Sequence, residues 1–245
     1  MKIKNLYTSI RSAKRAIAHP HCTAVIVAAG SASRMRGIDK ITEKLCGKPV
    51  LYHTVKTFSE CCMIDEIVIV CRKDRIDDIQ SICKGIKKVR LLIPGGETRT
   101  HSVYAGVMAA SEKSELIAVH DGARPLVSNE IICRTAEKAA HFGAAAPAIP
   151  VKDTIKQAKD GVIERTMERS SLYAVQTPQI FDADLLKGAL TNALQKKLPI
   201  TDDCSAVEAI GGQVHLVKGS EENIKITTPF DLKLAKLILE GRDLF

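Results

Sequence analysis

The stretch Thr23-Ala24-Val25-Ile26-Val27-Ala28-Ala29-Gly30 decides the fold class. Its first six residues form a short β-branched, apolar run, which is typical of a strand buried on both faces of a parallel sheet. Small residues follow as far as Ser33, and Arg34 comes next. In such a loop consecutive backbone N–H groups can cradle a phosphate, because small side chains let the backbone approach it closely. The stretch therefore predicts a buried strand that leads into an anion-binding loop, although a plain strand-to-loop turn has the same pattern.

Further apolar runs alternate with segments of helical spacing downstream. We expect strands at 66–71, 89–93, 116–120 and 143–150, and helices at 49–60, 74–83, 102–111 and 129–140. Strands and helices that alternate in this way indicate βαβ units around a mostly parallel, twisted sheet flanked by helices. The fold class is therefore α/β. In such sheets ligands bind beyond the carboxyl ends of the strands, where the strand order reverses.

The pattern changes after residue 150. Asp160-Gly161 separates two strand-like runs within 151–176, which is a strong hairpin signal. We expect this segment to be a β-arm that projects from the sheet. Because an isolated hairpin is barely stable in water, a second subunit is the natural surface for it to pack against. Helices are expected at 182–197, 203–210 and 229–240, and strands at 213–217 and 223–226.

Composition narrows the possible classes of protein. The chain has 245 residues, of which 45% are hydrophobic and 26% are charged, as in a soluble enzyme. It lacks the run of about 20 apolar residues that a membrane helix needs. The net charge is +8, but there is no Trp and only 4% of residues are aromatic, which argues against a base-stacking nucleic-acid platform. RNA binding would rest on charge and the basic N-terminus alone.

Cysteine usage and the N-terminus indicate compartment and domain organisation. None of the eight cysteines forms a C-x-x-C pair, which favours reduced thiols in a cytoplasmic protein. The N-terminus is basic and lacks the long apolar region of a secretory signal. We therefore expect a basic extension at 1–21 and a single domain over 22–245.

Four polar loops are candidates for a functional site. The first carries Arg34 and Lys40 after the strand at 23–28, and it lacks both the Walker and the G-x-G-x-x-G patterns. Cations there suit phosphoryl transfer, which needs positive charge where negative charge develops. The alternative is solvated surface charge, and Lys44 is a second candidate for the loop lysine. The other three loops are Gly95–Ser102, His120–Pro125 and Asn223–Thr227.

Each of the later loops also has a simpler interpretation. Glycines at 95 and 96 allow close backbone contact with a ligand, yet Ser102 could merely cap a helix. Asp121 at a strand's carboxyl end suits a divalent cation or a hydroxyl, and Arg124 could grip a phosphate, but the two could form a salt-bridged turn. Lys225 could reach an anion or simply face solvent. Together the loops predict phosphate chemistry on an anionic ligand, and no Ser/His/Asp or Cys/His arrangement indicates a nucleophile.

At these residues the chain resembles the 2-C-methyl-D-erythritol 4-phosphate cytidylyltransferase family of the non-mevalonate isoprenoid pathway. The resemblance runs from about Thr23 to the C-terminus. The family's motifs stand here, in order, as Ala28–Met35, His120–Pro125, Pro150–Thr154, Thr177–Gln179 and Asn223–Lys225. Five motifs in the same order make the match specific. Ala32 stands where the family usually has Gly, and Glu97 where Asp is frequent.

The resemblance implies a fold, a reaction and a set of roles. The fold is similar to that of nucleotide-diphospho-sugar transferases, and the enzyme is a cytoplasmic homodimer that uses Mg²⁺. The substrate phosphate attacks the α-phosphorus of CTP and pyrophosphate leaves. By position, Arg34 and Lys40 stabilise the transition state, and Arg169 and Lys225 hold the attacking phosphate. The implied substrate-binding residues are Arg124, Thr154 and Thr177, of which Thr154 and Thr177 belong with Arg169 to the arm region that reaches into the partner's site. The implied nucleotide-binding residues are Ala28, Ala29, Gly30, Gly96, Glu97 and Ser102, and Asp121 is placed beside the metal or substrate.

Two other functions remain open at this point. Ribitol 5-phosphate cytidylyltransferase resembles the family in fold and chemistry, although the Ala-Ala-Gly start of the first loop favours the methylerythritol enzyme. A non-catalytic nucleotide-binding or regulatory protein could also use this fold, but the presence of Arg34, Lys40 and Lys225 argues against it. Release of pyrophosphate distinguishes an enzyme from a binding protein.

Overall fold

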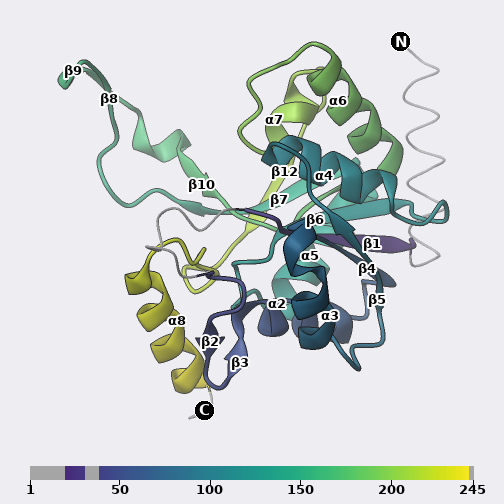
Figure 1. Ribbon diagram of the computed structural model, residues 1–245. Helices are drawn as coiled ribbons and strands as arrows, with labels where there is room; N and C mark the ends of the chain where they lie inside the picture. The colour runs from purple at the N-terminus through teal and green to yellow at the C-terminus, as the bar shows by residue number, and fades with distance from the viewer. Residues whose placement is uncertain (1–19, 31–38, 243–245) are drawn as a thin grey trace.

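A computed structural model describes residues 20–30 and 39–242, in which a central sheet carries helices on both faces (Figure 1). The sheet has the strand order β10-β7-β11-β6-β1-β4-β5, with β12 paired to β7. Its strands are β1 (Cys22–Ala28), β4 (Glu66–Cys71), β5 (Val89–Pro94), β6 (Leu116–Asp121), β7 (Ala144–Pro150), β10 (Tyr173–Val175), β11 (Gln179–Asp182) and β12 (His215–Lys218). The expectation of a mostly parallel α/β sheet is confirmed.

Strand β1 lies at the centre of this sheet. It pairs in parallel with β4 on one side and with β6 on the other. The chain therefore runs from β1 outward to β4 and β5, and then crosses back to β6. This is a reversal of strand order, and such a point is where ligands bind in open α/β sheets. The carboxyl ends of β1 and β6 meet there, at Ala28 and Asp121.

Helices cover both faces of the sheet, because buried side chains leave it in both directions. On one face Ile26 and Ile69 belong to an apolar cluster with α2 and α5. On the other face Val25 packs with α4 and α6. Close approach is needed there: a Cβ on Gly106 of α4 would lie 2.3 Å from Val25 Cγ1. The helices are α2 (Val50–Glu60), α3 (Ile76–Ile82), α4 (Arg99–Met108), α5 (Asn129–Phe142), α6 (Ala183–Gln195), α7 (Asp203–Glu208) and α8 (Pro229–Arg242).

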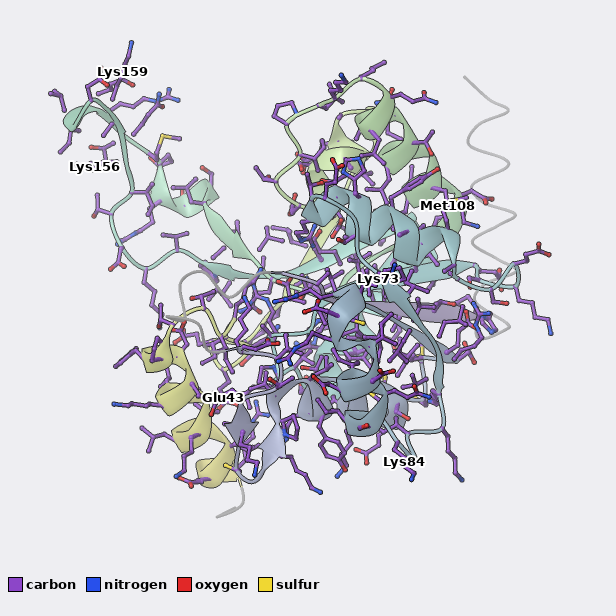
Figure 2. All side chains as sticks on the ribbon, viewed as in Figure 1. Glu43, Lys73, Lys84, Met108, Lys156 and Lys159 are labelled. Carbon is purple, nitrogen blue, oxygen red and sulfur yellow. The ribbon has the colours of Figure 1, made fainter. Side chains whose placement is uncertain are left out.

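Residues 151–172, between β7 and β10, leave the body of the protein as an arm (Figure 1). Strands β8 (Lys156–Lys159) and β9 (Val162–Thr166) form an antiparallel hairpin, and every residue of both is exposed. The turn contains Asp160 and Gly161, both with positive φ, as expected of Asp-Gly in a hairpin. In Figure 2 the labelled Lys156 and Lys159 lie far from the sheet, whereas Met108 and Lys84 lie on the body. The expected hairpin is present, and the described residues leave both of its strands exposed.

Two short strands and two 3₁₀ turns are the remaining elements of the described residues. Strands β2 (Lys44–Leu45) and β3 (Lys48–Pro49) pair just before α2, and the 3₁₀ turns η2 (Lys73–Arg75) and η3 (Arg169–Ser171) precede α3 and β10. Among the described residues, no helix combines the length and apolar character needed to cross a membrane.

Some expected boundaries were wrong. Helix α4 begins at Arg99 rather than at residue 102, because the Thr98 side chain accepts a hydrogen bond from the His101 N–H and caps it. The strand expected at 223–226 is absent from the sheet. Instead the Asn223 carbonyl accepts a hydrogen bond from Arg124 Nη1 at 2.7 Å, and the Ile226 N–H bonds to the Ala123 carbonyl. The segment is therefore tied to a loop rather than to a neighbouring strand.

Candidate active site

A cavity of about 380 Å³ opens at the carboxyl ends of the central strands. The loops that follow β1, β5 and β6 contribute to it, together with the segment that precedes α8. It is lined by Val27, Ala28, Ala29, Gly30, Lys40, Ile41, Gly96, Glu97, Thr98, Arg99, Ser102, Asp121, Ala123 and Lys225. Nine of the residues singled out from the sequence are therefore brought together, although they span almost two hundred positions of the chain.

Asp121 is the electrostatic centre of this cavity. Its carboxylate lies 2.9 Å from Lys225 Nζ, 3.3 Å from Arg124 Nε and 3.9 Å from Arg99 Nε. Burial alone would raise the pKa of Asp121, but Lys225, Arg99 and Arg124 overcome that effect and hold the pKa well below its usual range. Asp121 is therefore ionised at neutral pH, and it gathers three cationic side chains around one point.

His120 and Thr177 fix the turn that carries Asp121. His120 is fully buried and packs against the Phe58 ring at a centroid distance of 4.7 Å. Its Nε2 is 3.2 Å from the Arg124 carbonyl oxygen, which can only accept, so Nε2 carries the proton. Nδ1 then accepts from the Thr177 hydroxyl at 3.0 Å, and that hydroxyl accepts from the Asp121 N–H at 3.2 Å. Burial lowers the pKa of His120 to about 4, consistent with this neutral tautomer.

Thr177 and Arg124 were expected to contact substrate, but neither lines the cavity. Thr177 is 4% exposed, and its hydroxyl is engaged by Asp121 and His120. Arg124 lies beside the cavity and binds Asp121 and the Asn223 carbonyl oxygen. In this chain both residues hold together the loops that present Asp121 and Lys225. The simpler interpretation of Arg124, a salt-bridged turn, describes its contacts here.

The loop after β5 is shaped by Gly95, Gly96 and Ser102. A Cβ on Gly95 would lie 2.5 Å from Ala29 Cβ, so the loops after β1 and β5 touch at this point. Ser102 Oγ accepts from the Gly96 N–H at 3.1 Å and donates to the Thr98 carbonyl at 3.0 Å. This hydroxyl organises the loop. Glu97 lines the cavity beside it.

Lys40 lines the cavity, whereas Lys44 lies on β2 and is exposed. The geometry therefore favours Lys40 over Lys44 as the loop lysine. Arg34 lies outside the described residues, as do Ala32 and the rest of 31–38. At Gly30, which lines the cavity, an added Cβ would meet no described atom within 4 Å.

Thr154 and Arg169 stand apart from this cavity in their own chain. Thr154 is exposed near the base of the arm, and Arg169 Nη1 donates to the Lys152 carbonyl oxygen at 3.0 Å. Nine of the expected residues therefore line the cavity, whereas Thr154 and Arg169 lie on the arm.

Arg99 was not predicted from the sequence as a site residue, although it lies in the candidate loop Gly95–Ser102. Arg99 is the first residue of α4, where the positive end of the helix dipole disfavours a cation by about 0.3–1 kcal/mol. That unfavourable position was the available signal that Arg99 has an anionic partner. Its partner is Asp203, at 3.1 and 2.7 Å, and the two residues are 104 positions apart.

The described residues offer too few protein ligands to hold a divalent metal without help from substrate phosphates. No group of three or more acidic, His or Cys side chains within 20–30 and 39–242 could hold an ion. Asp121 and Glu97 are the two carboxylates among the described residues that line the cavity. Mg²⁺ is commonly bound by one or two carboxylates together with substrate phosphates. The site therefore fits a metal that arrives largely coordinated by nucleotide phosphates.

A mostly parallel α/β sheet with small-residue loops and converging cations at its strand ends suits a protein that binds the phosphates of a nucleotide. The sequence profile of the 2-C-methyl-D-erythritol 4-phosphate cytidylyltransferase family matches residues 22–241. The chain belongs to this family.

Individual relatives agree with this assignment. The chain is 43% identical over 222 residues to 2-C-methyl-D-erythritol 4-phosphate cytidylyltransferase of Caldanaerobacter subterraneus subsp. tengcongensis, covering 89% of this chain and 98% of that protein. It is 44% identical to the Bacillus licheniformis protein of the same name, with 89% and 95% coverage. Among crystal structures, 4-diphosphocytidyl-2C-methyl-D-erythritol synthase from Anaerococcus prevotii has a TM-score of 0.82 at 34% identity, covering 91% of this chain and 97% of that one.

Proposed function

We propose that the chain transfers CMP from CTP to 2-C-methyl-D-erythritol 4-phosphate in the synthesis of isoprenoid precursors. The products are 4-diphosphocytidyl-2-C-methyl-D-erythritol and pyrophosphate. Family membership supports this activity. The observation that carries it is the convergence of Lys40, Arg99 and Lys225 on one cavity beside the small residues of the first loop.

The reaction is an in-line displacement at phosphorus. An oxygen of the substrate's 4-phosphate forms a bond to the α-phosphorus of CTP, while the bond from that phosphorus to the bridging oxygen breaks and pyrophosphate leaves. Negative charge develops on the α-phosphoryl oxygens and on the leaving group, and positioned cations stabilise it. We assign this role to Arg34 and Lys40, since they belong to the loop after β1.

Lys225 is assigned to hold the attacking phosphate. Its amine lies 2.9 Å from Asp121, so the carboxylate keeps the cation at the cavity wall. An incoming phosphate can then share or replace that contact. Gly96, Glu97 and Ser102 are assigned to the cytidine side, together with Ala28, Ala29 and Gly30, because they line the same cavity.

Thr154 and Arg169 are assigned to the site of a second subunit. The arm that carries them is exposed along its length, and Val162 and Ile163 at its tip are 69% and 60% exposed. Apolar exposure of this kind on an unsupported hairpin favours burial against another chain. The proposed enzyme is therefore a cytoplasmic homodimer in which each arm completes the partner's cavity.

Mg²⁺ is the proposed cofactor. When bound to the CTP phosphates it would neutralise part of their charge and help to orient the triphosphate. We assign contact with the metal to Asp121, whose carboxylate lines the cavity. The remaining work falls to side chains of this chain: the cations of the cavity bind and orient the phosphates, and the packed loops after β1 and β5 enclose the nucleotide.

Pyrophosphate release tests the proposal. The purified protein is incubated with Mg²⁺, 2-C-methyl-D-erythritol 4-phosphate and each of CTP, UTP, ATP and GTP in turn, and pyrophosphate is measured. We expect release with CTP only. A parallel series replaces the acceptor with ribitol 5-phosphate. Faster turnover with ribitol 5-phosphate would assign the chain to that activity instead, and binding of CTP without pyrophosphate release by either acceptor would indicate a non-catalytic protein.

A further inference from the structure

Asp203 forms a buried ion pair with Arg99 at the back of the cavity. The Asp203 carboxylate receives Arg99 Nη1 at 3.1 Å and Nη2 at 2.7 Å, and its side chain is 1% exposed. Two parallel N–H···O bonds of this kind fix the plane of a guanidinium as well as its position. Arg99 lines the cavity, but Asp203 does not. Any effect of Asp203 on a ligand must therefore pass through Arg99.

The position of Asp203 is itself fixed by other buried groups. Gln179 of β11 is 2% exposed, and its Oε1 accepts from the Asp203 and Cys204 N–H groups at 3.0 and 3.1 Å. Gln179 Nε2 donates to Asp202, whose side chain caps α7. The carboxylate is therefore attached to the central sheet through a buried side chain, and it forms a rigid anchor for Arg99.

Arg99 has hydrogen-bonding capacity left for a ligand. A guanidinium carries five N–H donors in a rigid fork, and Asp203 takes two of them. The third charged contact, from Nε to Asp121, is 3.9 Å long and is an ion pair rather than a hydrogen bond. Burial alone would lower the pKa of Arg99, but Asp203 and Asp121 more than offset this and raise it. Arg99 is thus a permanent cation that lines the cavity and keeps three N–H donors beyond the two that Asp203 takes.

We propose that Asp203 is a positioning residue for the nucleotide: it orients Arg99 so that the free edge of the guanidinium binds CTP. This inference rests on the proposed function and adds a residue to it that lies outside the cavity. The interaction is made when CTP binds, so its loss weakens CTP binding more than it slows the chemical step. A merely structural aspartate would instead change stability and leave CTP affinity unaltered.

The test is a double-mutant cycle of Arg99→Gln, Asp203→Asn and the two changes together. Dissociation constants for CTP are measured by isothermal titration calorimetry without the acceptor, and kcat and KM for CTP are measured separately. We expect Asp203→Asn to raise the dissociation constant and KM roughly tenfold, as when one charge-assisted hydrogen bond is lost, with a smaller change in kcat. The double variant should bind CTP no worse than Arg99→Gln alone, because Asp203 acts through Arg99.

The double variant also guards against misfolding, since it removes both buried charges together and leaves neither unpaired. Asp182→Asn is the matched control: like Asp203, Asp182 is a buried aspartate at the start of a helix, in this case α6, which its side chain caps. It lies at the far end of β11 from Gln179. The variant should lower the melting temperature and leave CTP affinity unchanged.

Three outcomes separate this inference from the proposed function. If Asp203→Asn binds CTP within about twofold of the wild type, or if the effects of the two single changes multiply in the double variant, the positioning role is wrong. If the wild type binds CTP but releases no pyrophosphate, the transfer reaction fails while the positioning role is still decided by the dissociation constants. If the wild type does not bind CTP, both are wrong.

Discussion

The cavity and the arm contain residues of the same kind, but the fold treats them in opposite ways. At the cavity, cationic side chains are held by buried partners: Asp203 holds Arg99, and Asp121 holds Lys225 and Arg124. On the arm, Arg169 is exposed and donates to a backbone carbonyl, and no apolar cluster formed by residues 20–30 and 39–242 includes β8 or β9. The described residues thus assemble the cavity within a single chain and leave the arm exposed.

This difference shows where pre-organisation comes from. Side chains that must stabilise developing charge are effective when their positions are fixed before the reaction. The sheet and its helices provide that rigidity at the cavity. In the proposed dimer the arm would gain that rigidity by packing against the second subunit, so we expect the arm residues to act only there.

Among changes at the cavity, loss of the Lys225 amine should lower kcat the most. Removing one pre-organised cation that acts on the reacting phosphates typically costs about 10²–10³ in kcat, and we expect a loss of that order for Lys225→Ala. Steady-state pyrophosphate release measures it. Lys218→Ala, a change to an exposed lysine on β12, is the control and should retain full activity. A near-normal kcat in Lys225→Ala, with the fold intact by circular dichroism, would remove Lys225 from the mechanism.

The arm side is tested by complementation between two inactive variants. Arg169→Ala and Lys40→Ala should each be nearly inactive as homodimers. In a two-fold dimer with composite sites, random mixing of subunits restores roughly a quarter of wild-type activity, because each mixed dimer contains one intact site. Activity is measured after co-refolding, and tagged subunits verify that mixed dimers form. If mixed dimers are present but remain inactive, the arm does not complete the partner's site.

Core and arm isoleucines should differ in their effect on stability. Ile69 on β4 is fully buried, and Ile69→Ala should lower the free energy of unfolding by about 2–5 kcal/mol. Ile163 is 60% exposed in the single chain, so Ile163→Ala should change the stability of the monomer by less than about 0.5 kcal/mol. Urea unfolding at several protein concentrations measures both. We expect the effect of Ile163→Ala to grow with concentration as dimers form; an effect independent of concentration would show that the arm is not at a subunit interface.

The pH dependence of stability offers a further test on the cavity side. His120 is neutral when folded, with a pKa of about 4, against about 6.5 in an unfolded chain. The unfolded state therefore binds more protons between these values. Stability is complete above pH 6.5 and falls as the pH drops toward 4, by up to roughly 3 kcal/mol from this residue.

His120→Gln removes this titration and should flatten the profile over the same range, as measured by urea unfolding at each pH. The variant is expected to be less stable at pH 7, since it loses the packing on Phe58, so the comparison concerns the slope and not the absolute value. An unchanged slope would indicate that His120 titrates normally or is protonated when folded.

Local patterns predicted much of the fold. The run at 66–71 was expected as a strand and is β4, and the Asp160-Gly161 signal marks the turn of the arm. These predictions succeed because strand burial and turn geometry depend on neighbouring residues. The strand expected at 223–226 failed for the opposite reason: its backbone is bound by Arg124 and Ala123, which are about a hundred positions away. Nothing in the local pattern could reveal those partners.

The same division applies to the site. By itself the sequence determined the class of chemistry, because small-residue loops and cations follow strands whose ends must meet at one edge of a parallel sheet. Only the tertiary structure decided which side chains face the ligand: Lys40 lines the cavity and Lys44 does not, Thr177 is turned inward to His120, and Arg99 is held by Asp203. Strand order and helix packing set how close such side chains come to one another. An ion pair between residues far apart in the sequence depends on that arrangement, so it leaves no local pattern.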